Sequence, residues 1–158
     1  MKTFKILTSV LLLATVVFFS SCKKDDDDTA TPSNGGGTMQ LKYDGNDWSA
    51  TLSVVGTFSN GSVNITGTDA SQHQAGVMVY NVNGTGTYKI GSGSQNMGKW
   101  TQGLGQGDTY IANGALGSGE VNFTELTDKK AVGTFSFTGY SAAKGKISIT
   151  EGKFSVTF

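Results

Sequence analysis

The sequence has one cysteine, one histidine, one proline and no arginine among its 158 residues. A lone cysteine excludes an intrachain disulfide framework, and a single histidine falls short of the several His or Cys ligands that zinc catalysis uses. From Thr38 onward, eight lysines balance eight acidic residues. A neutral domain without arginine offers no cationic surface to phosphates. We therefore expect no nucleic-acid partner, no metal and no cofactor.

The N-terminal region lacks a hydrophobic run long enough to span a bilayer. Its apolar segment Ile6–Phe19 has 14 residues, whereas a membrane-spanning helix needs about 20. Two lysines precede this segment, and the small residues Ser20 and Ser21 follow it. This arrangement is typical of a secretory signal peptide, so we predict that residues 1–21 are an export signal rather than a membrane anchor.

Cys22 directly follows the predicted signal. The segment from Phe19 to Cys22 resembles the bacterial lipobox, although Phe19 and Ser21 depart from the usual Leu and Ala or Gly. The resemblance implies that the Cys22 thiol carries lipid and that Cys22 is the mature N-terminus; an unmodified thiol is the alternative. Each buried methylene contributes about 0.8 kcal/mol to membrane binding, so several acyl chains together would anchor the protein.

Residues 22–37 are predicted to form a tether. Four adjacent carboxylates, Asp25–Asp28, repel one another and stay solvated, and Thr29–Gly37 has the composition of a flexible linker. Two lysines followed by these acids resemble the export signal of Bacteroidetes surface lipoproteins. That resemblance implies display on the outer face of the outer membrane; a plain spacer, with the domain facing the periplasm, is the alternative.

Residues 38–158 are predicted to form an all-β domain of about ten short antiparallel strands, either a sandwich or a partly open barrel. Apolar residues alternate with polar ones, as in half-buried strands, and no stretch shows a helical stripe. The alternating sets are Trp48, Ala50, Leu52 and Val54; Val63 and Ile65; Met78, Tyr80 and Val82; Tyr88 and Ile90; Val121 and Phe123; Phe135 and Phe137; Ile147 and Ile149; and Phe154, Val156 and Phe158.

Turn signals separate these runs. Each contains a residue that tolerates the positive φ of tight hairpins, and they are Asp44-Gly45-Asn46, Asn60-Gly61, Asn83-Gly84 and Glu151-Gly152. The first superficially resembles a calcium loop, but it lacks the alternating ligands and the closing Glu. The glycine-rich segment Gly91–Gly107 is the least strand-like and is predicted to be a long loop.

Several segments resemble a family of small Bacteroidetes cell-envelope lipoproteins of unknown function. The matching segments cover most of Leu41–Phe158, and they are Asp44-Gly45, Trp48-Ser49-Ala50, Gly86-Thr87-Tyr88, Gly133–Phe137 and Ile149–Phe154. The resemblance implies a β-rich fold in the cell envelope. It implies no activity, so no functional residue is carried over.

The candidate ligand-binding residues are Trp100 and Tyr110. Both flank a glycine-rich polar segment that carries Gln95 and Asn96, so they could stack on sugar rings; the alternative is that they cap the core. His73 is predicted to be an exposed loop residue. The acidic residues are scattered, and no pair of facing carboxylates is evident for glycoside hydrolysis, so we expect no catalytic residues.

Three functions remain open from the sequence. The leading interpretation is a lipid-anchored, surface-exposed lipoprotein whose β domain is a non-catalytic binding module for a glycan or an envelope protein. The second is a structural accessory subunit that assembles through a sheet edge, since unpaired edges recruit strands. The third, a hydrolase, has the least support.

Overall fold

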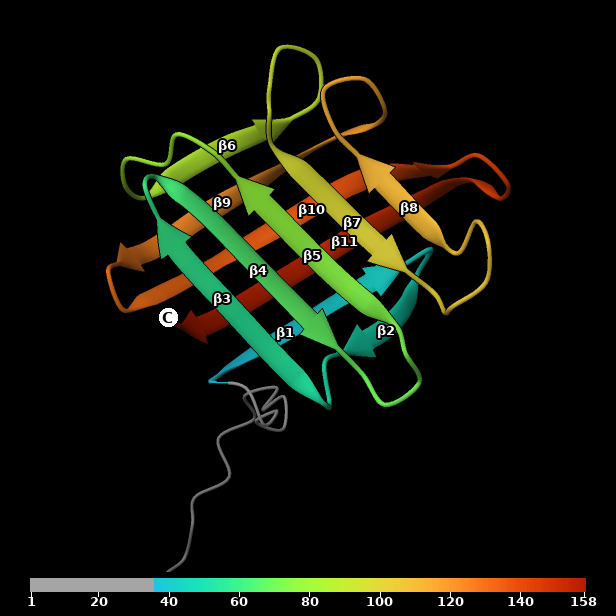
Figure 1. Cartoon of the computed structure of the whole chain (residues 1–158), viewed down its shortest axis with the longest axis horizontal. Coiled ribbons are helices and arrows are strands. Elements are labelled where there is room, and N and C mark those ends of the chain that lie inside the picture. Colours follow the sequence, from blue (N-terminus) through green and yellow to red (C-terminus); the bar gives the residue numbers. More distant parts are fainter. Residues whose placement is uncertain (1–35) are drawn as a thin grey trace, which may run out of the picture.

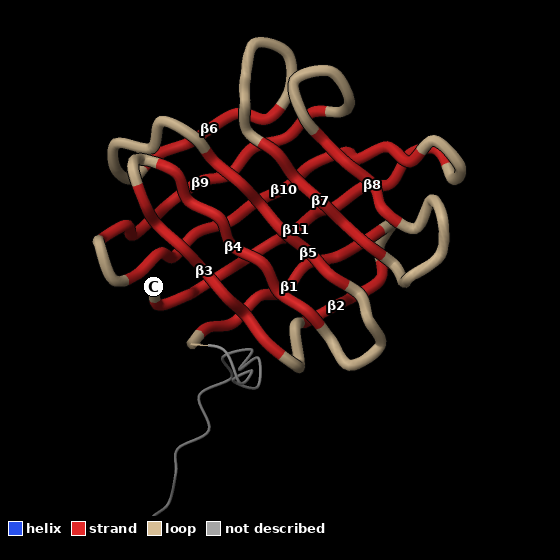
Figure 2. The backbone as a smooth tube through the Cα atoms, viewed as in Figure 1, coloured by secondary structure: helices blue, strands red, loops and turns tan. Residues whose placement is uncertain are grey.

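The computed structural model describes residues 36–158, which fold into eleven antiparallel strands (Figures 1 and 2). The strands are β1 (Gly37–Tyr43), β2 (Asn46–Ser49), β3 (Ser53–Ser59), β4 (Ser62–Thr68), β5 (Gln74–Val79), β6 (Gly86–Ile90), β7 (Met97–Thr101), β8 (Thr109–Ala112), β9 (Ser118–Thr127), β10 (Lys130–Ser141) and β11 (Gly145–Thr157). The predicted all-β class is confirmed. The predicted signal peptide, Cys22 and nearly all of the predicted tether lie outside the described residues.

The strands form one sheet that curls into a half-barrel with two crossing layers (Figure 1). One layer has the order β8-β7-β5-β4-β3, and the other has the order β6-β9-β10-β11-β1-β2. Strand β10 joins them, because it pairs with β9 and β11 and also with β8 at Tyr140 and Ile111. The sheet ends at β2, β3 and β6, each of which has a partner strand on one side only, so the partly open barrel is the observed architecture.

The core lies between the two layers and follows the period-two pattern. In β10, every second residue from Ala131 to Ser141 is buried. The buried apolar side chains come from both layers, and the largest of the fully buried ones are Trp100, Phe123, Met39, Ile65, Ile147 and Ile149. The predicted core pairs of β4, β9, β10 and β11 are all confirmed.

Two of the predicted hairpin turns are confirmed. Asp44 and Gly45 have φ values of 46° and 85°, and Asn60 and Gly61 have values of 50° and 68°. Positive φ at both central residues is the geometry of the type I′ turn, whose twist matches that of paired strands. The Asp44 carboxylate also accepts a hydrogen bond from the Ser148 backbone N–H at 2.9 Å. This acidic segment is thus a hairpin turn that ties β1 to β11.

The predicted turn at Glu151-Gly152 is wrong, because β11 runs through it as one strand. Glu151 has a φ of 52°, and the pairing of β11 with both neighbours shifts by one residue there. This β-bulge explains the misleading pattern. Before the bulge the buried residues are the odd-numbered Ile147 and Ile149, and after it they are the even-numbered Phe154 and Val156. The bulge inserts one residue into the strand, so both sets of side chains face the core.

Two other loop predictions are corrected. Asn83-Gly84 does not close a hairpin: β5 pairs with β4 and β7, whereas β6 pairs with β9 in the other layer. The segment Gly91–Gly107 is not one long loop, because it contains β7. Its Gly98 lies where the layers approach closely, and a Cβ there would sit 2.5 Å from the Phe137 ring. The close packing of the layers requires glycine at position 98, but glycine lowers the strand propensity of this segment in the sequence.

Three predicted core positions are also wrong. Leu52 is 51% exposed, because it lies between β2 and β3 rather than inside one long strand. In β5 the buried side chains are Ala75, Val77 and Val79, which have the opposite parity to the predicted Met78 and Tyr80. The larger side chains therefore lie on the outer face of the sheet, where Tyr80 lines the groove described next.

Candidate functional site

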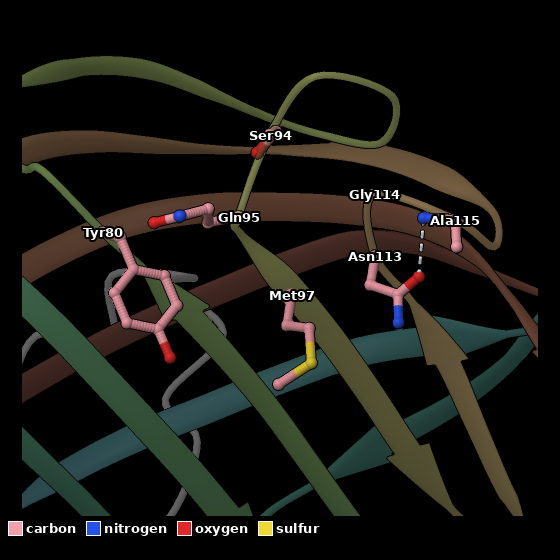
Figure 3. A pocket seen from close by; sticks show the side chains of 7 residues that line it. All are labelled: Tyr80, Ser94, Gln95, Met97, Asn113, Gly114 and Ala115. Atoms are coloured by element: carbon pink, nitrogen blue, oxygen red, sulfur yellow. Dashed lines mark hydrogen bonds between the residues drawn. The ribbon is translucent and has the colours of Figure 1, made fainter.

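A shallow groove of about 560 Å³ lies on the outer face of the layer that contains β5, β7 and β8 (Figure 3). Two connections border it: the β6–β7 connection supplies Ser94 and Gln95, and the β8–β9 connection supplies Asn113, Gly114 and Ala115. Tyr80 and Met97 complete the lining. The volume falls within the range of about 300–1,000 Å³ that is typical of small-ligand sites.

Tyr80 supplies the aromatic surface of the groove. It directly follows β5, and its backbone N–H donates to the Asn96 side-chain oxygen at 2.9 Å. Its hydroxyl donates to the sulfur of Met78 at 2.7 Å. Figure 3 shows the ring beside Gln95 and Met97. The Tyr80 backbone and the hydroxyl of its ring are each held by a hydrogen bond, so the aromatic face is preorganised.

Asn96 connects the elements that border the groove. This side chain is only 8% exposed. Its amide nitrogen donates to the Lys89 backbone carbonyl at 2.8 Å, while its amide oxygen accepts from Tyr80. The Asn96 backbone N–H donates to the Ser94 hydroxyl at 2.9 Å. A buried amide with both ends satisfied fixes the end of β5 against the β6–β7 connection.

Asn113 holds the other border rigid. Its side-chain oxygen accepts hydrogen bonds from the backbone N–H groups of Ala115 at 2.9 Å and Leu116 at 2.8 Å, the bond to Ala115 being drawn in Figure 3. Such side-chain-to-backbone bonds are characteristic of Asx turns. The next residue, Gly114, lies against the other connection, since a Cβ there would sit 2.8 Å from the Ser94 carbonyl oxygen. The two borders are thus in contact.

The groove is lined entirely by uncharged residues. Within residues 36–158, neither the Gln95 amide nor the Asn113 amide nitrogen makes a hydrogen bond inside the protein, so both can bind a ligand. An aromatic ring beside free amides suits a ligand that has an apolar face and hydroxyl groups. The lining offers no cation to an anionic ligand and no carboxylate to a metal or cationic ligand.

Trp100 and Tyr110 are both buried, so of the two interpretations that the sequence left open, capping of the core is the one observed. Trp100 is 0% exposed and Tyr110 is 6% exposed. Trp100 stacks against Tyr43 at 4.9 Å and against His73 at 5.7 Å, and it meets Trp48 edge-on at 5.2 Å. These side chains join the layers at one end of the core, so neither predicted ligand-binding residue presents a stacking face.

His73 is also more enclosed than predicted, although it does lie in a loop before β5. Its side chain is 26% exposed, and its Nδ1 lies 2.8 Å from Oδ2 of Asp69. The same Asp69 oxygen accepts the Trp48 indole N–H at 2.8 Å. Among the described residues, no serine or threonine hydroxyl is hydrogen-bonded to His73. The Asp69–His73 pair therefore lacks the nucleophile of a catalytic triad.

Burial raises the pKa of Asp69, but the hydrogen bonds that it accepts outweigh this effect. Partial burial is the largest single influence, and it is opposed by the side-chain and backbone hydrogen bonds of His73 and by the bond from Trp48. The net result is a pKa below the ordinary 3.8. Asp69 is therefore a carboxylate that holds the β4–β5 connection against the aromatic cluster.

Four of the eight acidic residues in 38–158 pair with separate lysines on the surface. Glu120 pairs with Lys89, and Glu151 pairs with Lys42. Both glutamates border a second hollow of about 430 Å³ over β10 and β11, but their side chains are 44% and 63% exposed. Within the described part of the chain, no group of three or more His, Cys, Asp or Glu side chains could hold a metal ion.

Residues 36–156 match the family described as a domain of unknown function, DUF6252. This match covers most of the chain, so the chain belongs to that family. No curated protein and no solved structure matches the chain significantly. Residues 36–158 include no helix with the length and apolar character needed to cross a membrane.

Of the residues that line the groove, Gln95 lies in a segment that the sequence singled out, whereas Tyr80, Met97 and Asn113 do not stand out in the sequence as candidates. Tyr80 was assigned to the core because Met78, Tyr80 and Val82 form an apolar alternating set. The smaller set Ala75, Val77 and Val79 is the buried one. An Asn-Gly pair at 113–114 was the available turn signal, but nothing in the sequence places this turn beside Gln95.

Proposed function

We propose that this protein is a lipid-anchored, surface-exposed lipoprotein whose β domain is a non-catalytic module that binds a neutral glycan. The groove beside Tyr80 is the binding site in this proposal. The predicted lipidation of Cys22 would hold the domain at the outer membrane, and the predicted tether would separate the domain from the lipid surface.

One observation carries the proposal: the groove combines an aromatic ring, two free amide groups and no charge. Sugars present an apolar ring face and a rim of hydroxyl groups, and they match this set. A phosphate or carboxylate ligand would have no cationic partner in the lining. The ring of Tyr80 would stack on one sugar, while Gln95 and Asn113 would hydrogen-bond to its hydroxyls.

We expect Tyr80→Ala to weaken glycan binding about tenfold, because an aromatic contact contributes about 0.5–1.5 kcal/mol beyond its burial. A soluble 36–158 fragment would first be applied to an array of neutral oligosaccharides. Calorimetric titration of the strongest ligand would then measure the affinity of each variant. Tyr80→Phe keeps the ring and should retain most of the affinity.

Tyr140→Ala is the matched control, because Tyr140 is 38% exposed on β10 and does not line the groove. This variant should bind like the wild type. If no neutral glycan binds the wild-type fragment, or if Tyr80→Ala and Tyr140→Ala bind equally well, the groove is not a glycan site.

The anchor is tested separately on the full chain made in its own cells. We expect intact mass spectrometry to find a mature N-terminus at Cys22 with acyl chains attached, and Cys22→Ser to release the protein from the membrane fraction. The release is expected because the acyl chains on Cys22 together provide the membrane affinity, and Cys22→Ser removes all of them. An unmodified Cys22 thiol, or cleavage at another residue, would overturn the anchoring proposal and leave the groove unaffected.

A further inference from the structure

The described sheet has three edge strands, and they differ sharply in their protection. β2 has four residues and carries Asp47, and β6 has five residues and carries Lys89. β3 has seven residues, and none of them is charged or proline. Its pairing with β4 runs without a register shift, so no bulge interrupts it. Natural sheets usually protect their edges by short length, charge, proline or a bulge, and β3 has none of these.

The absence of charge extends beyond the edge strand to the whole β3–β4 hairpin. No charged residue occurs in 50–68. Outward-facing side chains on β3 include Val55, which is 56% exposed, and the exposed Thr57. Leu52, just before the strand, is 51% exposed. The open edge is therefore flanked by apolar and small polar groups that can approach another strand without desolvating a charge.

We propose that β3 pairs antiparallel with β3 of a second copy of this chain, which gives a symmetric dimer with one continuous sheet. An isologous interface brings the same surface together from both copies. Charge repulsion would oppose that encounter on β2 or β6, but none arises on β3. A strand of a different protein would find no charged group on this hairpin that allows selective recognition. A second copy of β3 does not need such a group, because an uncharged edge meets its own copy without repulsion.

The twofold symmetry determines the direction in which the two grooves face, and its consequence for glycan binding rests on the proposed function. An antiparallel pair of identical strands is related by a twofold axis perpendicular to the sheet, so the outer faces of both copies point to the same side. Both Tyr80 grooves would then face one direction. A multivalent glycan could engage both, and binding two sites at once raises avidity without new contacts.

The test uses the 36–158 fragment, which contains all eleven strands and the complete described core. Sedimentation velocity without glycan over a hundredfold concentration range should show a monomer–dimer equilibrium. We expect the double variant Val55→Lys with Thr57→Lys to weaken dimerisation about tenfold or more, because the pairing would bring like charges close together. Thr87→Lys, an exposed threonine on the β6 edge, should dimerise like the wild type.

Circular dichroism would establish that each lysine variant keeps its fold. A second measurement uses the absence of cysteine from residues 36–158. Oxidation of the double variant Val55→Cys with Thr57→Cys should give a disulfide-linked dimer, whereas oxidation of Thr87→Cys should not. A wild-type fragment that stays monomeric throughout the range, or lysine variants that dimerise normally, would overturn the proposal whether or not glycan binding is found.

Discussion

Replacing Trp100 with alanine is expected to destabilise the domain by about 3–5 kcal/mol, as is typical when a large buried aromatic side chain is removed. Trp100 is fully buried and contacts three other aromatic rings. Folded domains are stable by only about 5–15 kcal/mol. The variant should therefore have a much lower midpoint in urea, with a large unfolded fraction at physiological temperature.

Trp100→Phe separates ring packing from side-chain polarity at this position. The indole N–H of Trp100 is buried without a hydrogen-bond partner in the described structure, and burying such a group costs about 1–3 kcal/mol. Phenylalanine keeps a ring in contact with Tyr43 and His73 and removes this unpaired donor. We expect Trp100→Phe to lose less than half of the stability that Trp100→Ala loses, as measured by urea denaturation followed by circular dichroism.

The same pair of variants distinguishes the two roles considered for Trp100. If its ring were an exposed sugar-binding platform, Trp100→Ala would fold normally and lose only glycan affinity. An unchanged urea midpoint for Trp100→Ala would therefore contradict the buried position of the side chain. Loss of binding in this variant is interpretable only when its folded fraction has been measured.

Asp69→Ala is expected to cost about 2–3 kcal/mol at neutral pH, because a hydrogen bond to a charged group contributes about 1.5–3 kcal/mol. The substitution leaves the Trp48 indole N–H without its acceptor and removes two hydrogen bonds to His73. The β4–β5 connection would then be held less firmly against the aromatic cluster. Urea denaturation at neutral pH measures the loss.

The cost of Asp69→Ala should depend on pH in a specific direction. The pKa of Asp69 is lower in the folded protein than its ordinary 3.8, so folding favours the ionised form. This stabilisation is present above the unfolded pKa and is lost as pH falls through the folded pKa. The stability gap between wild type and Asp69→Ala should therefore be widest above about pH 5 and should narrow towards about pH 2.

Asp128→Ala provides the control for this measurement. Asp128 is exposed between β9 and β10, where a surface substitution usually changes stability by less than about 0.5 kcal/mol. Its difference from wild type should stay small across the same pH range. A gap for Asp69→Ala that stays constant down to low pH would show that the Asp69 charge does not stabilise the fold.

The alternation of apolar and polar residues was sufficient to predict the strands in which it is uninterrupted. Examples are the strands that contain Val63 and Ile65 or Phe135 and Phe137. It failed where a strand bends or approaches another layer. The bulge at Glu151 changes the apolar parity within β11, so one strand was predicted as two. Gly98 lowers the strand signal of β7, because the space that its side chain would fill is occupied by Phe137.

The candidate site was only partly predictable, because its residues are distant in the sequence. Tyr80, Gln95 and Asn113 come from three separate connections. Their proximity follows from the order of β5, β7 and β8 in the sheet and from the hydrogen bonds of Asn96. The sequence indicated a sugar site where aromatic residues lie close to amides in the chain, which pointed to Trp100. The aromatic ring that borders the groove is instead that of Tyr80.

The sequence by itself determined the all-β class, the two type I′ hairpins and most of the core positions, because these depend on alternation and on residues that tolerate positive φ. It also carries the prediction of an exported, lipid-anchored chain, which lies in residues outside the described fold. Only the tertiary structure decided which aromatics are buried, where the groove forms and which edge is open. Those features depend on pairing between distant strands, and a local pattern contains no information about such pairing.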